Sequence, residues 1–161
     1  MGVGKSTIAR AFSAKTGIYC LDTDDLIESY ENRNIKTIFE EDGEAYFRKC
    51  ESSTAKWLSK NVKNTIIATG GGFFMAEGFE EIGTVVYLKS SFKSILKQLS
   101  KNPSSKGELA KRPLFQNETE AKDLYENRSF MYEKKAEIVL SVENRPIKEI
   151  VDSLIRSLNL Y

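Results

Sequence analysis

The run that decides the fold is Gly2-Val3-Gly4-Lys5-Ser6-Thr7. Glycines have no Cβ, so backbone N–H groups can curl around phosphate oxygens there. In this pattern the Lys5 ammonium reaches the β- and γ-phosphates of a nucleotide, and the Ser6 hydroxyl is a ligand for Mg²⁺. A helix that starts at this point adds the positive end of its dipole. The run therefore predicts a loop that binds ATP together with Mg²⁺.

The complete form of this pattern, G-x-x-x-x-G-K-[ST], has one more glycine, which would fall before Met1, and it follows a buried strand. We expect about eight to ten preceding residues that supply the strand and the glycine. Without them, neighbouring strands would lose a hydrogen-bonding partner and an apolar slot would open in the core. We therefore expect the first strand to be missing and the 161-residue chain to be poorly folded or weakly active.

Beyond this run, short apolar stretches alternate with helical patterns. We expect strands at residues 18–21, 65–69, 84–88 and 136–142, and helices at residues 6–15, 44–60, 120–135 and from Pro146 onward. Apolar strands between helices are typical of a parallel sheet that is buried on both faces. In the second helix we expect one buried face, made of Phe47, Cys50, Thr54, Trp57 and Leu58. The sequence thus predicts an α/β fold with a central parallel sheet flanked by helices.

A polar segment interrupts the alternation. Residues 102–107 read Asn-Pro-Ser-Ser-Lys-Gly and lead to Arg112. Loops of this length are uncommon unless they have a function, so we expect a mobile lid at about residues 102–117. No repeat or linker divides the chain, and we expect a single domain over residues 1–161.

Composition excludes several kinds of site. The chain has no histidine, which rules out Ser-His-Asp and Cys-His nucleophile systems and imidazole zinc sites. Its two cysteines, Cys20 and Cys50, cannot form a disulfide framework or a Cys₄ site. The net charge of +1 favours neither nucleic acid nor an anionic membrane. We expect a cytoplasmic monomer with no nucleic-acid or membrane partner.

Charge is distributed unevenly along the chain. Residues 22–51 hold ten acidic and four basic side chains, whereas residues 89–112 hold seven basic side chains and one acidic one. Such a separation is expected of a site that binds a polyanion through a metal ion. It is also compatible with ordinary solvated helix faces.

Candidate polar groups follow the first two predicted strands. Asp22 and Asp24 point the same way by strand alternation, and ligands of open α/β sheets bind beyond the carboxyl ends of strands. One carboxylate can support Mg²⁺ while the other accepts a proton, although aspartate is also a common helix cap. Glycines 70–72 allow a ligand close to the backbone, or form only a tight turn.

Three arginines are candidates for binding an anion: Arg48, Arg112 and Arg128. A planar guanidinium suits a carboxylate or a phosphate. Taken singly, each arginine is also compatible with an exposed surface charge.

Taken together, these motifs resemble those of the shikimate kinase family. In order they are the glycine-lysine loop, Leu-Asp-Thr-Asp at 21–24, Gly-Glu and Phe-Arg within 43–48, three glycines at 70–72, Arg-Pro-Leu at 112–114, Asn-Arg at 127–128 and Tyr132. Gluconate kinases and nucleotide kinases share the loop but not this combination. The resemblance implies a P-loop kinase fold and transfer of the γ-phosphoryl group of ATP to the 3-hydroxyl of shikimate.

On the ATP side, the resemblance implies that Lys5 and Ser6 hold the phosphates and Mg²⁺, that Asp22 supports the metal and that Arg112 closes over ATP. The other ATP-binding positions would be Gly2, Val3, Gly4 and Thr7.

On the substrate side, the resemblance implies that Asp24 binds the ring hydroxyls and acts as the base. Arg48 and Arg128 would bind the shikimate carboxylate, and the Gly71 N–H would contact the substrate. Lys5, Asp24 and Arg112 would be the catalytic residues. Two alternatives stay open: another small-metabolite kinase, such as a gluconate kinase, and a non-catalytic nucleotide-binding relative.

Overall fold

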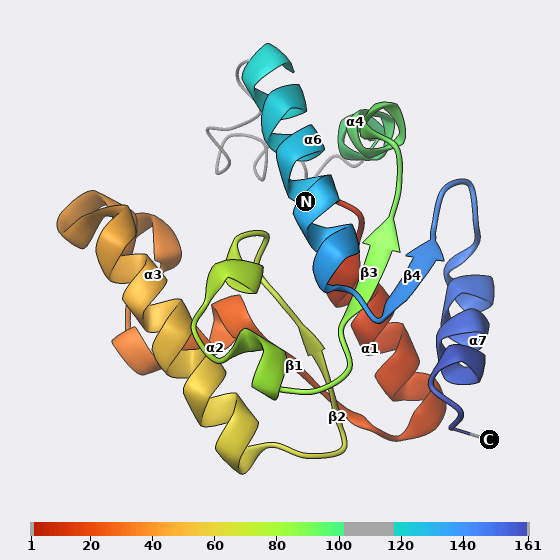
Figure 1. Ribbon diagram of the computed structural model, residues 1–161, viewed down its shortest axis with the longest axis horizontal. Helices are drawn as coiled ribbons and strands as arrows, with labels where there is room; N and C mark the ends of the chain where they lie inside the picture. Colours follow the sequence, from red (N-terminus) through yellow and green to blue (C-terminus); the bar gives the residue numbers. More distant parts are fainter. Residues whose placement is uncertain (1, 102–117, 161) are drawn as a thin grey trace. The chain divides into compact units, whose positions relative to one another are not determined.

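The computed structural model describes residues 2–101 and 118–160 (Figure 1). The predicted lid at 102–117, with Arg112, lies outside these residues. The chain forms two compact units: the first unit is Lys5–Thr84, and the second unit combines Met1–Gly4 with Val85–Tyr161. Each unit contains one pair of parallel strands, so the parallel pairing expected from the sequence is confirmed in both.

The elements of the first unit are α1 (Lys5–Thr16), β1 (Tyr19–Asp22), α2 (Thr23–Glu31), α3 (Ile35–Asn61), β2 (Thr65–Ala68), and the short 3₁₀ helices η1 (Phe73–Met75) and η2 (Phe79–Glu81). The predicted helix at 6–15 and the strands at 18–21 and 65–69 are confirmed within one or two residues. β1 and β2 pair in register, with Asp22 opposite Ala68. The carboxyl ends of both strands therefore lie at one edge, and the segments that follow them begin side by side.

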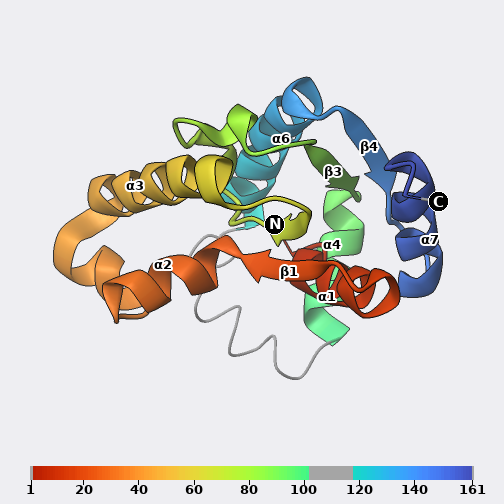
Figure 2. The same ribbon diagram turned by 90° about the horizontal axis from the view of Figure 1, so that it is seen from below.

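Figure 2 shows α2 continuing from the end of β1 and α3 folding back beside it. Asn34 starts α3 as an N-cap, since its side chain accepts a hydrogen bond from the Thr37 N–H at 2.8 Å. Gly43 interrupts the helix with φ 79° and ψ 174°, a conformation that glycine adopts readily. α3 is thus two helical segments, residues 35–42 and 44–61, and the predicted start at residue 44 marks the second.

The buried face of α3 differs from the predicted one. Phe47, Glu51, Ala55 and Leu58 are buried, whereas Trp57 is 49% exposed, so the prediction of Trp57 as a core residue is wrong. The reason is geometric: the buried residues follow one another at spacings of three and four, and Trp57 lies about 100° around the helix from Leu58. Glu51 is one of these buried residues, so the buried face of α3 includes a carboxylate.

The second unit contains β3 (Val86–Lys89), α4 (Phe92–Lys101), α6 (Glu118–Lys135), β4 (Ile138–Ser141) and α7 (Ile147–Ser157). β3 and β4 pair in parallel, and α7 packs beside β4 (Figure 1). The helix predicted from Pro146 onward is confirmed within one residue: Pro146 occupies the N-cap position, α7 begins at Ile147, and the helix buries Ile150, Val151, Leu154 and Ile155.

The prediction that the strands are buried on both faces is wrong, most clearly at two apolar side chains. Tyr19 of β1 is 83% exposed and Val139 of β4 is 49% exposed. The alternation of a strand sends neighbouring side chains to opposite faces, and at these two positions the face is open. No described helix combines the length and the apolar composition that crossing a bilayer requires.

Candidate active site

The glycine-rich run forms a turn that leads directly into α1. Gly2 and Gly4 have positive φ values of 65° and 82°, which side chains with a Cβ adopt at a cost. Val3 between them is buried, and α1 begins at Lys5. The first turn of a helix has N–H groups without intrahelical partners, which suit an anion. Thr7, also in this first turn, is exposed.

Ser6 and Asp22 lie in direct contact in the first unit. The Ser6 hydroxyl donates a hydrogen bond to Asp22 Oδ2 at 2.6 Å. The other oxygen, Oδ1, accepts from the Asp24 N–H at 3.0 Å and caps α2. Asp22 therefore fits both readings of the sequence, as a helix cap and as a candidate metal ligand. A hydroxyl and a carboxylate are hard oxygen donors, the kind that Mg²⁺ takes from proteins alongside phosphate and water oxygens, so these residues fit that ion.

The glycine turn, residues 70–72, lies against two of the predicted substrate residues. A Cβ on Gly70 would come within 2.6 Å of Asp24 Oδ1, and one on Gly72 within 2.9 Å of Arg48 Cζ. The Gly70 N–H also donates to the hydroxyl of the buried Thr23 at 3.0 Å. Neither Gly70 nor Gly72 has a positive φ, so a side chain at either position would be opposed by the close approach of Asp24 or Arg48 and not by the backbone conformation.

The guanidinium of Arg48 is held by two carboxylates of its own helix. It contacts Glu51 at 2.6 Å and Glu44 at 2.8 Å. Burial acts to lower the pKa of Arg48, but the hydrogen bonds to Glu51 and Glu44 outweigh it, so the pKa lies above its ordinary value. Glu51 itself is 1% exposed, which places a charge-paired carboxylate beneath the guanidinium. Our reading of the sequence missed Glu51, although its spacing of three from Arg48 was a signal for such a pair.

Arg128 belongs to α6 in the second unit. There it lines a hollow of about 20 Å³, together with Val3, Tyr87, Ser90 and Tyr132 among others. That volume has room for one water molecule. Burial raises the pKa of Tyr132, and the charge of Arg128 opposes this rise. Arg128 is therefore partly buried rather than a plain surface charge.

The chain matches known proteins over nearly its whole length. The family model described as shikimate kinase matches residues 1–159. A shikimate kinase of Helicobacter hepaticus is 42% identical over 141 residues, which cover 88% of this chain and 81% of that protein.

Two solved structures agree with this result. The shikimate kinase of Acinetobacter baumannii, determined in complex with shikimate, has a TM-score of 0.83 and 28% identity and covers 99% of this chain and 89% of its own. The shikimate kinase of Aquifex aeolicus has a TM-score of 0.78 and 35% identity, with 99% and 92% covered.

These matches confirm the P-loop kinase fold and favour neither a gluconate kinase nor a non-catalytic relative. The chain belongs to the shikimate kinase family, and its activity is the ATP-dependent phosphorylation of shikimate.

Proposed function

We propose that this kinase phosphorylates the 3-hydroxyl of shikimate at a site built on the glycine turn. One observation supports this most directly: the Asp24 carboxylate and the Arg48 guanidinium lie against Gly70 and Gly72 of the same turn. A protein carboxylate can accept hydrogen bonds from the hydroxyls of a ring, and a guanidinium can bind the carboxylate of a ligand. Shikimate carries both groups, so it would span the turn with the N–H of Gly71 between its two ends.

In the reaction, Asp24 accepts the proton of the 3-hydroxyl as its O–H bond breaks. The hydroxyl oxygen forms a bond to the γ-phosphorus, and the bond from that phosphorus to the bridging oxygen breaks, so that ADP leaves with the electron pair. Arg48, with Arg128, would bind the shikimate carboxylate. Glu51 would keep the Arg48 guanidinium in place through their 2.6 Å ion pair.

On the ATP side, the loop from Gly2 to Thr7 would bind the phosphates, with the Lys5 ammonium on the β- and γ-phosphates. Ser6 and Asp22 would hold Mg²⁺, which when bound neutralises charge on the phosphate oxygens. Within the described parts of the chain, no group of three carboxylate or thiol side chains is arranged so that it could hold a metal ion. The remaining Mg²⁺ ligands would then be phosphates and water, as is usual for this ion.

Several expectations from the sequence remain predictions. They are the phosphate contact of Arg112, the lid at 102–117, the single domain over 1–161, the monomeric state and the cytoplasmic location.

The role of Asp24 is tested with Asp24→Asn. We expect kcat to fall by about 10²-fold or more, the scale of losing a general base, with little change in the KM for ATP. Gly70→Ala should also lower kcat, because the added Cβ displaces the Asp24 carboxylate without removing it. The control is Asp25→Asn, an exposed neighbour on α2, which should keep wild-type turnover.

The readouts are steady-state kinetics for both substrates and NMR of the product, in which coupling of a ring proton to phosphorus identifies the phosphorylated carbon. Near wild-type turnover of Asp24→Asn would remove this residue from the mechanism.

A further inference from the structure

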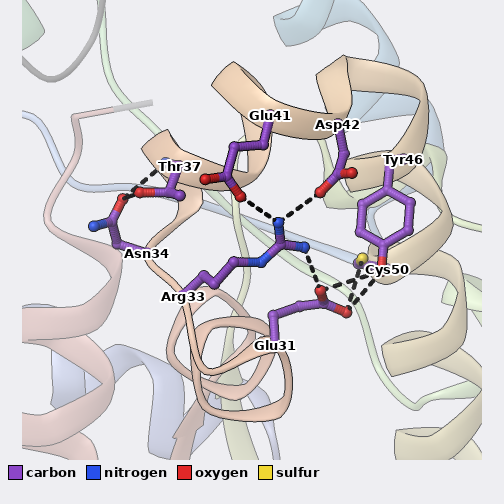
Figure 3. A network of polar contacts seen from close by, with 8 residues as sticks. All are labelled: Glu31, Arg33, Asn34, Thr37, Glu41, Asp42, Tyr46 and Cys50. Atoms are coloured by element: carbon purple, nitrogen blue, oxygen red, sulfur yellow. Dashed lines mark hydrogen bonds and ion pairs between the residues drawn. The ribbon is translucent and has the colours of Figure 1, made fainter.

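We infer that Arg33 is a positioning residue for the shikimate site: it fixes the direction of the helical segment that carries Arg48. This inference rests on the proposed function, in which Arg48 binds the shikimate carboxylate. Arg33 lies in the turn between α2 and α3 and is the centre of a group that we call the Arg33 cluster (Figure 3). Its members are Glu31, Arg33, Glu41, Asp42, Tyr46 and Cys50.

The need for positioning comes from the kink at Gly43. Helical hydrogen bonds fix the direction of a helix from turn to turn, and the non-helical conformation of Gly43, with its positive φ, breaks that regularity. Arg48 begins the second turn after the kink, on the segment 44–61. The direction of that segment must therefore be set by contacts outside the backbone of α3.

On the near side of the kink, Arg33 binds the last turn of the first segment. Its Nη1 contacts Glu41 at 2.8 Å and Asp42 at 2.6 Å. These two carboxylates immediately precede Gly43, so the guanidinium holds the chain at the point where the helix changes direction.

On the far side of the kink, Arg33 acts through Glu31, the last residue of α2. Arg33 Nη2 contacts Glu31 at 2.8 Å, and Glu31 also accepts hydrogen bonds from the Tyr46 hydroxyl at 3.1 Å and from Cys50 Sγ at 3.7 Å. The hydrogen bond from Arg33 holds the pKa of Glu31 below its ordinary value. Glu31 is thus ionised at neutral pH and links α2 to the second segment.

The geometry of the second segment connects the cluster to the substrate site. Tyr46 and Cys50 are four residues apart and share the side of the helix that faces α2. Arg48 lies midway between them in sequence, so its side chain leaves on the other side of the helix, where it meets Gly72. α2 carries Asp24 in its first turn. The cluster therefore joins the far end of the Asp24 helix to the segment that carries Arg48.

Apolar packing holds the same elements together but sets direction less strictly. Ile27, Ile38 and Phe47 form one buried cluster beneath these contacts, and the rings of Phe39 and Phe47 lie 4.8 Å apart across the kink. Burial of apolar area is non-directional, whereas a guanidinium fork binds carboxylates in a fixed geometry. We therefore infer that the apolar cluster holds α2 and the two segments of α3 together, and that Arg33 fixes the direction of the second segment.

The test compares Arg33→Ala and Arg33→Lys with the control Lys36→Ala. Lys36 belongs to an exposed pair with Glu40 in the first segment, at 3.6 Å, that reaches neither α2 nor the second segment. For Arg33→Ala we expect the KM for shikimate to rise about tenfold, less than the roughly 10²-fold of a 1 Å misplacement, with the KM for ATP within about twofold of wild type. Arg33→Lys should recover part of the loss, because an ammonium can still bind one carboxylate, and Lys36→Ala should behave as wild type.

Thermal denaturation shows whether each variant is folded. If Arg33→Ala lowers the melting temperature and the active fraction but leaves the KM for shikimate unchanged, Arg33 only stabilises the fold and the inference is wrong.

A double variant separates this inference from the proposed function. Arg48→Lys alone should weaken shikimate binding, and adding Arg33→Ala should then change it by less than about twofold, since coupled residues are not additive. If the double variant instead weakens shikimate binding by the product of the two single effects, Arg33 does not act through Arg48. If Arg48→Lys alone binds shikimate normally, the proposed function itself fails.

Discussion

Gly72→Ala changes the position of Arg48 without changing its chemistry. Gly72 has φ −100° and ψ −6°, a conformation open to alanine, so the substitution adds no backbone strain. The new Cβ would lie 2.9 Å from Arg48 Cζ, 3.0 Å from Nη2 and closer still to Nη1, where ordinary contacts are 3.4–4 Å. The guanidinium must therefore retreat by roughly 1 Å or more.

That retreat has two consequences. It stretches the 2.6 Å contact with Glu51, and a buried carboxylate that loses a hydrogen bond costs about 1–3 kcal/mol of the free energy of unfolding. It also moves the guanidinium away from the bound carboxylate of shikimate. A 1 Å misplacement can cost about 10²-fold, so we expect shikimate to bind roughly 10- to 100-fold more weakly.

Isothermal titration calorimetry with shikimate and chemical denaturation measure the two effects. The matched control is Gly17→Ala: Gly17 has φ 75°, and a Cβ added there would meet no atom within 4 Å. This variant should lose about 1–2 kcal/mol of stability through backbone strain alone and bind shikimate as wild type does. If Gly72→Ala binds shikimate within twofold of wild type, the close approach of Arg48 to the glycine turn does not form part of the substrate site.

Two further outcomes concern stability. Leu58→Ala should lower the free energy of unfolding by about 2–5 kcal/mol, because Leu58 is fully buried, while denaturant titration of Trp57→Ala, next to it and half exposed, should show a smaller loss. Hydrogen bonds from the hydroxyls of Ser94 and Ser91 hold the pKa of Glu143 below its ordinary 4.5, so its stabilisation is present above that pH and is lost as the pH falls through the lower folded value. Melting temperatures of Glu143→Gln should accordingly be lower than wild type at pH 7, and the difference should disappear as the pH falls below the lowered pKa of Glu143.

The sequence was most informative where chemistry and local structure coincide. The glycine-lysine run and the strand ends combine a backbone requirement with a candidate functional residue, and Pro146 combines a fixed φ with the start of a helix; each lies within one or two residues of its predicted place. α2 escaped prediction because its nine residues bury only Thr23 and Ile27, too few to give a helical period. The first segment of α3 escaped it for a similar reason, since Gly43 reads as the boundary of a helix.

The candidate site was predicted as separate residues rather than as an arrangement. Asp24, Arg48 and the three glycines were named from motifs, but their common location depends on β1 and β2 ending at the same edge. Glu51 was overlooked because a charged residue in a helix is ordinarily assigned to solvent. Arg33 was overlooked because its partners are distributed between two helices and form no motif.

The ion pair of Arg48 with Glu51 also limits how this protein can evolve a new substrate. An acceptor without a carboxylate has no use for the guanidinium, yet replacing Arg48 alone leaves the Glu51 charge buried without its 2.6 Å partner. Such a step costs about 1–3 kcal/mol or more, a large share of the stability of a small protein. Replacing Glu51 first removes the support of the guanidinium and weakens the existing activity. A lineage that leaves shikimate behind must therefore change both residues nearly together, and this barrier preserves the specificity of the site.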